Sequence, residues 1–165
     1  MPSIFFALQP QQETQWCWAA MAVSIDQTLR NPKPSTATQC RLANTALIRM
    51  DCCSAPCPDA CNQASSLGAA LAALGWLRGA PTTGAIALEV VETRIGANQP
   101  VPVRIQGSLS RAFHIVAISG WDPTLGVLVQ NPAHGGSATW VLFAEFPNQY
   151  PLYPGDWVNT YQVGK

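Results

Sequence analysis

The chain has 165 residues, a length that suits one domain with a sizeable core, and we expect residues 1–165 to form a single domain. Nine basic and nine acidic residues cancel, and only 11% of residues are charged, against roughly 25% in an average globular protein. This balance argues against nucleic-acid and membrane-surface partners, which require basic patches. No apolar run approaches the roughly 20 residues of a membrane-spanning helix, so no membrane association is expected.

The first predicted helix runs from Trp16 to Leu29, where strong helix formers follow one another without Gly or Pro, and it ends before Pro32. Cys17 lies in its first turn. A helix N-terminus carries partial positive charge, which should lower the pKa of the thiol and favour the nucleophilic thiolate. An isolated cysteine is more often a buried structural residue, so the segment around Cys17 must decide.

Three more helices are expected in the first half of the chain. One spans 35–47 with Ser35 or Thr36 as its N-cap, one spans 65–74 and stops at Gly75, and one spans 84–95 with Val91 and Ile95 on its apolar face. From Val101 the pattern changes to alternating or continuous apolar runs, which predict strands at 101–105, 113–120, 126–130, 138–143 and 157–163. Helices followed by strands predict an α+β fold.

A nucleophilic cysteine needs a base and a residue that orients the base, and the chain offers two histidines. His114 opens the apolar strand 113–120, where it could equally be a hydrogen-bonded core histidine. His134 lies between Pro132 and Gly135 in a loop by composition, where a solvated side chain is the default.

The segment QQETQWCWAA, residues 11–20, resembles the papain-like cysteine proteases. It is most similar to the branch of Avr-type effector proteases of plant-pathogenic bacteria, and it is also similar to the peptidase domains that trim double-glycine leader peptides. The resemblance implies a helical N-terminal half, whose central helix bears the nucleophile, packed on an antiparallel sheet. By position it makes Cys17 the nucleophile and Gln11 the oxyanion-stabilising residue, with Gln12 and Gln15 as rivals for the second role.

The same resemblance assigns the base and its partner. In papain-like families a histidine that opens one strand is followed by Asn or Asp at the end of the next strand, which matches His114 and Asn131. Asp122 is the competing third member, although its place before Pro123 also fits an ordinary turn. A tryptophan often shields the His–Asn pair, and Trp121 is the candidate here. The expected catalytic set is Cys17, His114, Asn131 and Gln11.

The other five cysteines lie between Cys40 and Cys61, a density that implies disulfides or a metal. The spacing of Cys53, Cys57 and Cys61 could serve zinc, although paired CxxC motifs are missing. The segment is similar to the cysteine-bearing insert of secreted members of the Avr-type branch, which favours two disulfides. We expect Cys40 to pair with one of Cys52 and Cys53, Cys61 to pair with the other, and Cys57 to stay free. Disulfides would place the protein outside the reducing cytosol, secreted or periplasmic, although residues 1–8 do not form a signal peptide.

The resemblance therefore implies a cysteine endopeptidase that hydrolyses peptide bonds through a Cys–His–Asn triad and a thioester acyl-enzyme, as a secreted bacterial protease or effector toxin. One alternative is an amidase of cell-wall peptides, which would cleave purified peptidoglycan. Another is a non-catalytic peptide-binding module, which would not react with an active-site thiol probe. We expect a monomer without cofactor or metal, with a peptide or protein as substrate and an inhibitor or immunity protein as a further partner.

Overall fold

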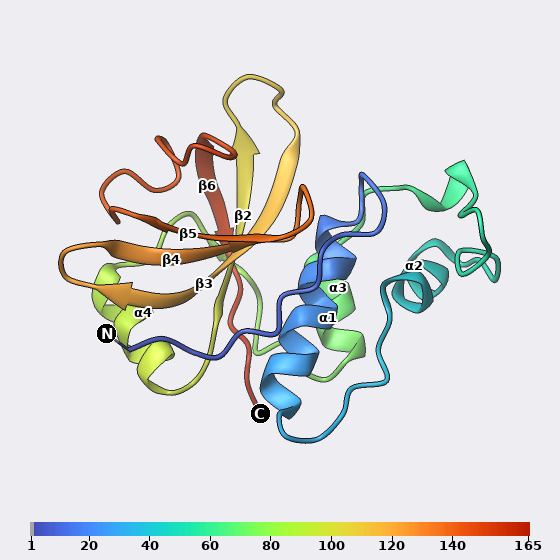
Figure 1. The fold of residues 1–165 in the computed structure, drawn as a ribbon, viewed down its shortest axis with the longest axis horizontal. Helices are drawn as coiled ribbons and strands as arrows, with labels where there is room; N and C mark the ends of the chain where they lie inside the picture. Colours follow the sequence, from blue (N-terminus) through green and yellow to red (C-terminus); the bar gives the residue numbers. More distant parts are fainter. Residues whose placement is uncertain (1) are drawn as a thin grey trace.

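The computed structural model describes residues 2–165 and has helices in the first half and an antiparallel sheet in the second (Figure 1). The helices are α1 (Cys17–Arg30), α2 (Gln39–Leu47), the 3₁₀ turn η1 (Asp59–Cys61), α3 (Leu67–Ala73) and α4 (Leu88–Gly96). The strands are β1 (Thr82–Thr83), β2 (Val101–Gly107), β3 (Phe113–Asp122), β4 (Gly126–Asn131), β5 (Ser137–Val141) and β6 (Gly155–Thr160). The sheet order is β1-β6-β2-β3-β4-β5. The α+β class and the papain-like arrangement of a central helix against a sheet are confirmed.

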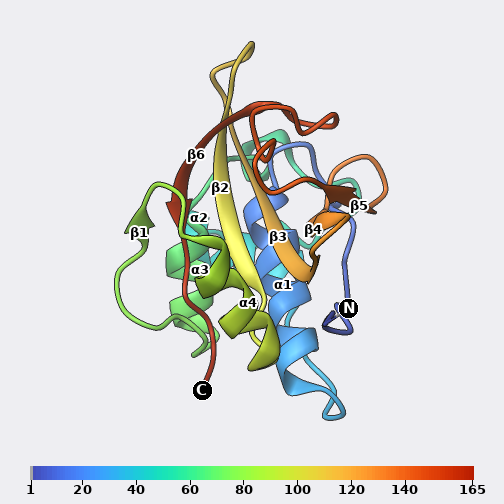
Figure 2. The same ribbon diagram turned by 90° about the vertical axis from the view of Figure 1, so that its left-hand side faces the viewer.

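Strand β3 is the shared wall of two apolar clusters. Its odd-numbered residues Ile115 and Ala117 pack with α1, α2 and α3, whereas its even-numbered residues Val116 and Ile118 pack with β2, β4 and α4. The helices therefore cover both faces of the sheet, with α1 and α3 on one face and α4 on the other, as Figure 2 shows. None of the helices in residues 2–165 is long and apolar enough to cross a bilayer.

Three predicted helices start later than expected, α3 by two residues and α2 and α4 by four residues each. Helix α2 begins at Gln39 with Thr38 as its N-cap, because the Thr38 hydroxyl accepts the Arg41 amide. The Ser35 hydroxyl instead donates a hydrogen bond to the Asp26 carboxylate. Helix α4 begins at Leu88, since Gly84 adopts a φ of 77° that a helix cannot continue through. The strand expected at 157–163 instead covers Gly155–Thr160, and the two-residue strand β1 beside it was not predicted.

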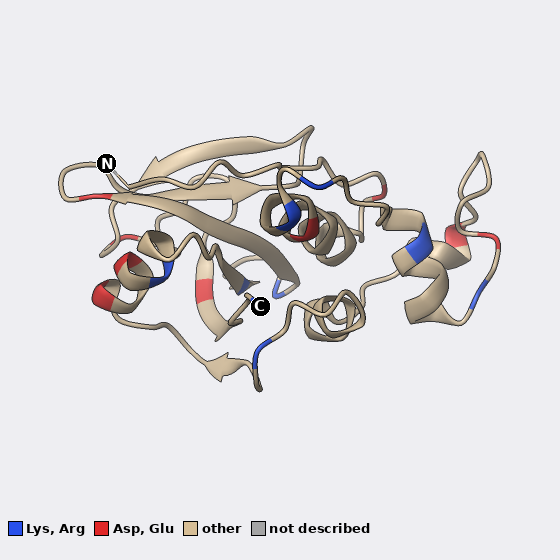
Figure 3. Ribbon diagram, turned by 90° about the horizontal axis from the view of Figure 1, so that it is seen from below, with Lys and Arg blue, Asp and Glu red and all other residues tan. Residues whose placement is uncertain are grey.

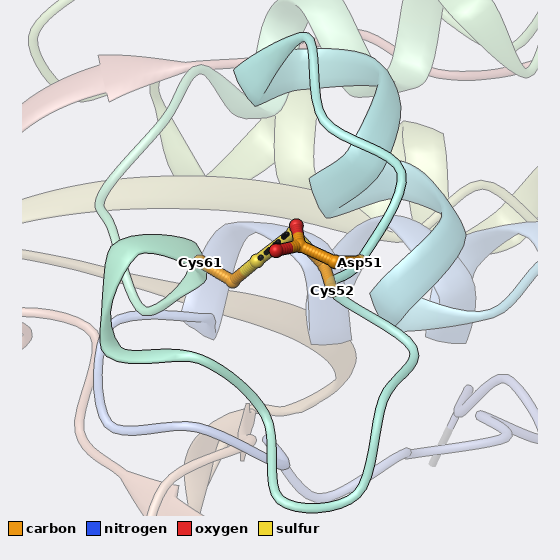
Figure 4. Close-up of side chains that lie close together, drawn as sticks. All are labelled: Asp51, Cys52 and Cys61. Atoms are coloured by element: carbon orange, nitrogen blue, oxygen red, sulfur yellow. Dashed lines mark hydrogen bonds between the residues drawn. A yellow bond between two sulfur atoms is a disulfide. The ribbon is translucent and has the colours of Figure 1, made fainter.

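The cysteine-rich segment that follows α2 and ends at Cys61 lies at the end of the molecule farthest from the sheet, next to α2 (Figure 1). Disulfides join Cys40 to Cys53 and Cys52 to Cys61, which confirms the expected pairing, and Cys57 is free. Figure 4 shows the Asp51 carboxylate against the Cys52–Cys61 bridge. Cys53 and Cys61, two of the three cysteines that a zinc site would use, form disulfides, so the zinc alternative is wrong for this structure.

Reduction of the bridges should destabilise the fold in two stages. The Cys52–Cys61 bridge is buried, whereas Cys53 is exposed, so a mild thiol reductant should open Cys40–Cys53 first. Each bridge should stabilise the fold by about 2–4 kcal/mol. Thermal unfolding after graded reduction, with alkylated thiols counted by intact mass, tests this order. Unreduced protein should show two reactive thiols, Cys17 and Cys57, and six reactive thiols would contradict the pairing.

Candidate active site

Cys17 is the first residue of α1, and its two tryptophan neighbours fix the start of this helix. The indole N–H of Trp16 donates to the carbonyl of Cys61 at 2.7 Å, and the indole N–H of Trp18 donates to the carbonyl of Gln63 at 3.1 Å. Both indoles are buried, while Cys17 between them is half-buried. The Trp–Cys–Trp sequence thus anchors the helix start to the disulfide loop and leaves the thiol accessible.

His114 and Asn131 meet across the β3–β4 hairpin. The last ladder pair is Ala117 with Gln130, so Asn131 would lie opposite Val116, and His114 is its diagonal neighbour on the same face. The His114 Nε2 and Asn131 Oδ1 atoms are 2.8 Å apart, and both side chains are buried. Because Nε2 is committed to Asn131, Nδ1 is the atom that remains for exchanging a proton.

Two tyrosines from the loop before β6 complete the surroundings of His114, and the sequence analysis missed both. The Asn131 amide donates to the Tyr150 hydroxyl at 3.1 Å, which orients its carbonyl toward His114. The Tyr153 ring lies 4.8 Å from the His114 ring, and its hydroxyl donates to the Ala112 carbonyl. The expected shield Trp121 instead packs against the apolar cluster at the far end of β3, so that expectation is wrong.

The thiol and the imidazole lie at the junction of α1 with β3. The backbone amide of Ile115, the residue after His114, faces the Cys17 sulfur. His114 and Asn131 open into a pocket of about 450 Å³, and Cys17 opens into a second pocket of about 350 Å³. Within residues 2–165 no hydrogen bond joins the Cys17 thiol to the His114 imidazole, whose Nε2 contacts Asn131 instead.

Burial sets the protonation of both groups. It raises the pKa of the Cys17 thiol above its ordinary value of 9.0, although the amides of Ile115, Trp18 and Cys17 and the Arg104 guanidinium act in the opposite direction. Burial also lowers the pKa of His114 below its ordinary value of 6.5, against the effect of the Asn131 hydrogen bond. Burial therefore outweighs the helix-start amides, and the expectation that the helix start would lower the thiol pKa is wrong.

The lowered pKa of His114 gives a pH prediction. A base must be unprotonated to accept a proton, and a lowered pKa keeps His114 unprotonated further into the acid range. The acid limb of kcat/KM on an uncharged peptide should therefore have its midpoint below pH 6.5. His134→Asn should move this midpoint slightly upward, because the charge of His134 lowers the pKa of His114. A wild-type midpoint at or above pH 6.5 would contradict the assignment.

Gln11 lies beside this site but is held by its own loop. Its backbone amide donates to the Pro132 carbonyl at 2.8 Å, next to Asn131. Its side-chain amide donates to the carbonyls of Glu13 at 3.0 Å and Thr14 at 2.9 Å, and its Oε1 is buried without a partner. Donation to an oxyanion would require the release of one of these carbonyls, so the oxyanion role of Gln11 stays a prediction.

The rival glutamines are exposed. Gln12 lines the pocket of His114, and its backbone amide donates to the buried side chain of Gln39 at 2.9 Å. The backbone amide of Gln15 donates to Asn62 at 2.8 Å. Gln39 also donates to the Pro10 carbonyl, so this residue, which the sequence analysis missed, fixes the loop that carries Gln11.

Asp122 was the alternative third member of the triad, and His134 was the alternative base. Asp122 lies far from the His114–Asn131 pair, and His134 is exposed to solvent. The Asp122 carboxylate accepts the amides of Thr124 and Leu125 at 2.8 Å, and it lies at the opposite end of β3 from His114. Eight strand residues span about 26 Å, too far for a triad contact. His134 is exposed in its loop and lines the same pocket as His114.

A cysteine at a helix start and a buried His–Asn pair are groups that thiol-dependent hydrolases use. The family model described as Peptidase_C39 like family matches residues 4–156. The chain therefore belongs to this family and is a cysteine protease by class, and the expected relationship to the papain-like cysteine proteases is confirmed at the level of the family.

The other comparisons add little to this identification. No curated protein matches the chain. Among solved structures, the chain is similar to the crystal structure of the Pseudomonas avirulence protein AvrPphB, with 11% identity over 97% of this chain and 98% of the other, at a TM-score of 0.44. At this level the similarity carries no weight for function.

Proposed function

We propose that this protein is a papain-like endopeptidase that hydrolyses peptide bonds with Cys17 as nucleophile, His114 as base and Asn131 as the residue that orients the base. The observation that carries the proposal is the buried 2.8 Å contact between His114 and Asn131, one residue from the amide that faces the Cys17 sulfur. The buried contact holds the imidazole in one orientation.

The reaction starts from the uncharged pair. The thiol proton passes to His114 Nδ1 as Cys17 Sγ forms a bond to the substrate carbonyl carbon. The oxyanion accepts the backbone N–H of Cys17, one of the amides that a helix start leaves unpaired, and a rearranged Gln11 side chain is the second donor. His114 then protonates the departing amine as the C–N bond breaks. Water attacks the thioester, gives its proton to His114, and releases the acid and the free thiol.

We further propose that the enzyme works outside the reducing cytosol, as a secreted or periplasmic protein. The two disulfides support this, because such bridges persist only in oxidising compartments. We also propose that the protein is a monomer, that its substrate is a peptide or protein, and that a cognate inhibitor binds to it.

The direct test is incubation with a proteome-derived peptide library, followed by mass spectrometry of the new termini, with purified peptidoglycan as a parallel substrate. We expect cleaved peptides and intact peptidoglycan. Cleaved peptidoglycan with intact peptides would overturn the proposal in favour of a cell-wall amidase. Absence of both turnover and Cys17 labelling by an active-site thiol probe would leave only a peptide-binding module.

A further inference from the structure

The pocket that receives the Cys17 side chain has no role in the proton transfers above. It has a volume of about 350 Å³ and is bounded by the start of α1, the segment that leads into α3, and residues of β2, β3 and the C-terminal segment. The residues that matter for its chemistry are Cys17, Ser65, Arg104, Phe113, Ile115 and Tyr161. Because Cys17 lines this pocket, a group next to the carbonyl that Cys17 attacks can enter it.

The sheet register brings Arg104 into this pocket. Arg104 pairs with Ile115 on one side and with Asn159 on the other, so the three side chains share the face of the sheet that α1 covers. The Arg104 guanidinium lies 3.5 Å from the centre of the Phe113 ring, and its Nη1 donates to the side-chain Oδ1 of Asn159 at 3.4 Å. The Phe113 ring and the position of Arg104 in β2 hold the guanidinium in the pocket that Cys17 lines.

This guanidinium has no carboxylate partner. Within residues 2–165 the ion pairs are Arg30 with Asp26 and Arg49 with Asp51, and no Asp or Glu lines the pocket. Charged residues are sparse over the whole fold, as Figure 3 shows. A half-buried guanidinium with free N–H groups is well suited to bind a carboxylate with two parallel hydrogen bonds.

We propose that Arg104 makes this pocket a subsite for a carboxylate of the substrate, adjacent to the carbonyl that Cys17 attacks. The proposal rests on the proposed function and deepens it, because it names the substrate class. The carboxylate can belong to an Asp or Glu side chain next to the scissile bond or to a peptide C-terminus close to it. Phe113 and Ile115 would contact the methylene groups of the same residue.

The first test uses peptides that differ by Glu or Gln at one position on either side of the cleaved bond. At one position, wild-type kcat/KM should be about 10- to 100-fold higher for Glu, the range for a hydrogen bond to a charged group. Arg104→Gln should reduce this ratio to near one, and Arg104→Lys should retain part of it. Arg41→Gln, on the exposed surface of α2, is the matched control and should leave the ratio unchanged.

The source of the carboxylate is resolved by a second pair of peptides that end close to the cleaved bond as a free acid or as an amide. A preference for the free acid assigns the subsite to a terminal carboxylate, and a preference for Glu within an amidated peptide assigns it to a side chain. If cleavage occurs and neither preference is seen in the wild type, the proposal is overturned while the protease function stands.

An alkylation experiment tests the subsite without any proteolysis. Iodoacetate carries a carboxylate and iodoacetamide does not, and both react with the same thiolate, so the ratio of their rates cancels any change in thiol pKa. Mass spectrometry of the Cys17 peptide should show that Arg104→Gln lowers this ratio about 10-fold, while Arg41→Gln does not. A ratio that does not depend on Arg104 overturns the proposal. An Arg104-dependent ratio in a protein that cleaves no peptide supports the subsite and removes the proposed function. If Arg104→Gln does not fold, Arg104→Lys and the wild-type Glu preference decide.

Discussion

Replacement of Cys17 by alanine should reduce peptide hydrolysis by about 10⁴- to 10⁶-fold and leave the fold intact. The loss is this large because the sulfur forms the covalent intermediate, and the other catalytic groups act only through it. Cys17 is half-buried at the end of α1, and the tryptophans beside it carry the hydrogen bonds that anchor the helix. The measurements are kcat/KM on a cleaved peptide and thermal unfolding of the same preparation.

Cys57→Ala is the matched control, because Cys57 is the other free thiol in residues 2–165. It should keep wild-type turnover, and it should lose one of the two thiols that iodoacetamide labels. Residual hydrolysis in Cys17→Ala above 1% of wild type, with the fold retained, would falsify Cys17 as the nucleophile.

Replacement of His114 should have the second largest effect. His114→Ala removes the group that accepts and returns the proton, and general base catalysis contributes about 10²- to 10⁴-fold. The labelling of Cys17 should also change. Without His114 the thiol has no base to accept its proton, so alkylation of Cys17 should become slower at neutral pH.

Three variants separate the roles around His114. Asn131→Ala should cost less than His114→Ala, about 10- to 100-fold, because it removes the orienting contact and leaves the base. His134→Asn should be mild, since His134 is exposed. Asp122→Ala should leave turnover near wild type, because its carboxylate only caps a turn. A folded Asp122→Ala that is worse than Asn131→Ala would transfer the third position of the triad to Asp122.

Local signals in the sequence were sufficient for the parts of the molecule that depend on neighbours in the chain. The start of α1 follows from a run without Gly or Pro after Trp16. The His114–Asn131 contact follows from two strands joined by a tight turn, which must lie side by side. The catalytic roles of these residues came from the family resemblance, and they remain predictions.

Residues whose position depends on distant segments were not predictable. Arg104 faces Cys17 only because β2 lies between β6 and β3, an order that no local pattern records. Tyr150 contacts Asn131 and Tyr153 contacts His114 from a loop that lies much further along the chain. The start of α2 was ambiguous because Ser35, Thr36 and Thr38 are all good N-caps, and the contact of Ser35 with Asp26 decided the outcome.

The two-sided packing of β3 limits how this chain can vary in evolution. Side chains alternate between the faces of a strand, so one residue inserted between His114 and Ile118 would exchange the inward faces of both apolar clusters. The exposed turn at 108–111 has no such constraint, because its residues pack against neither cluster. Homologous chains can therefore differ in length within this turn, whereas in β3, the strand that follows, they can differ only by substitution.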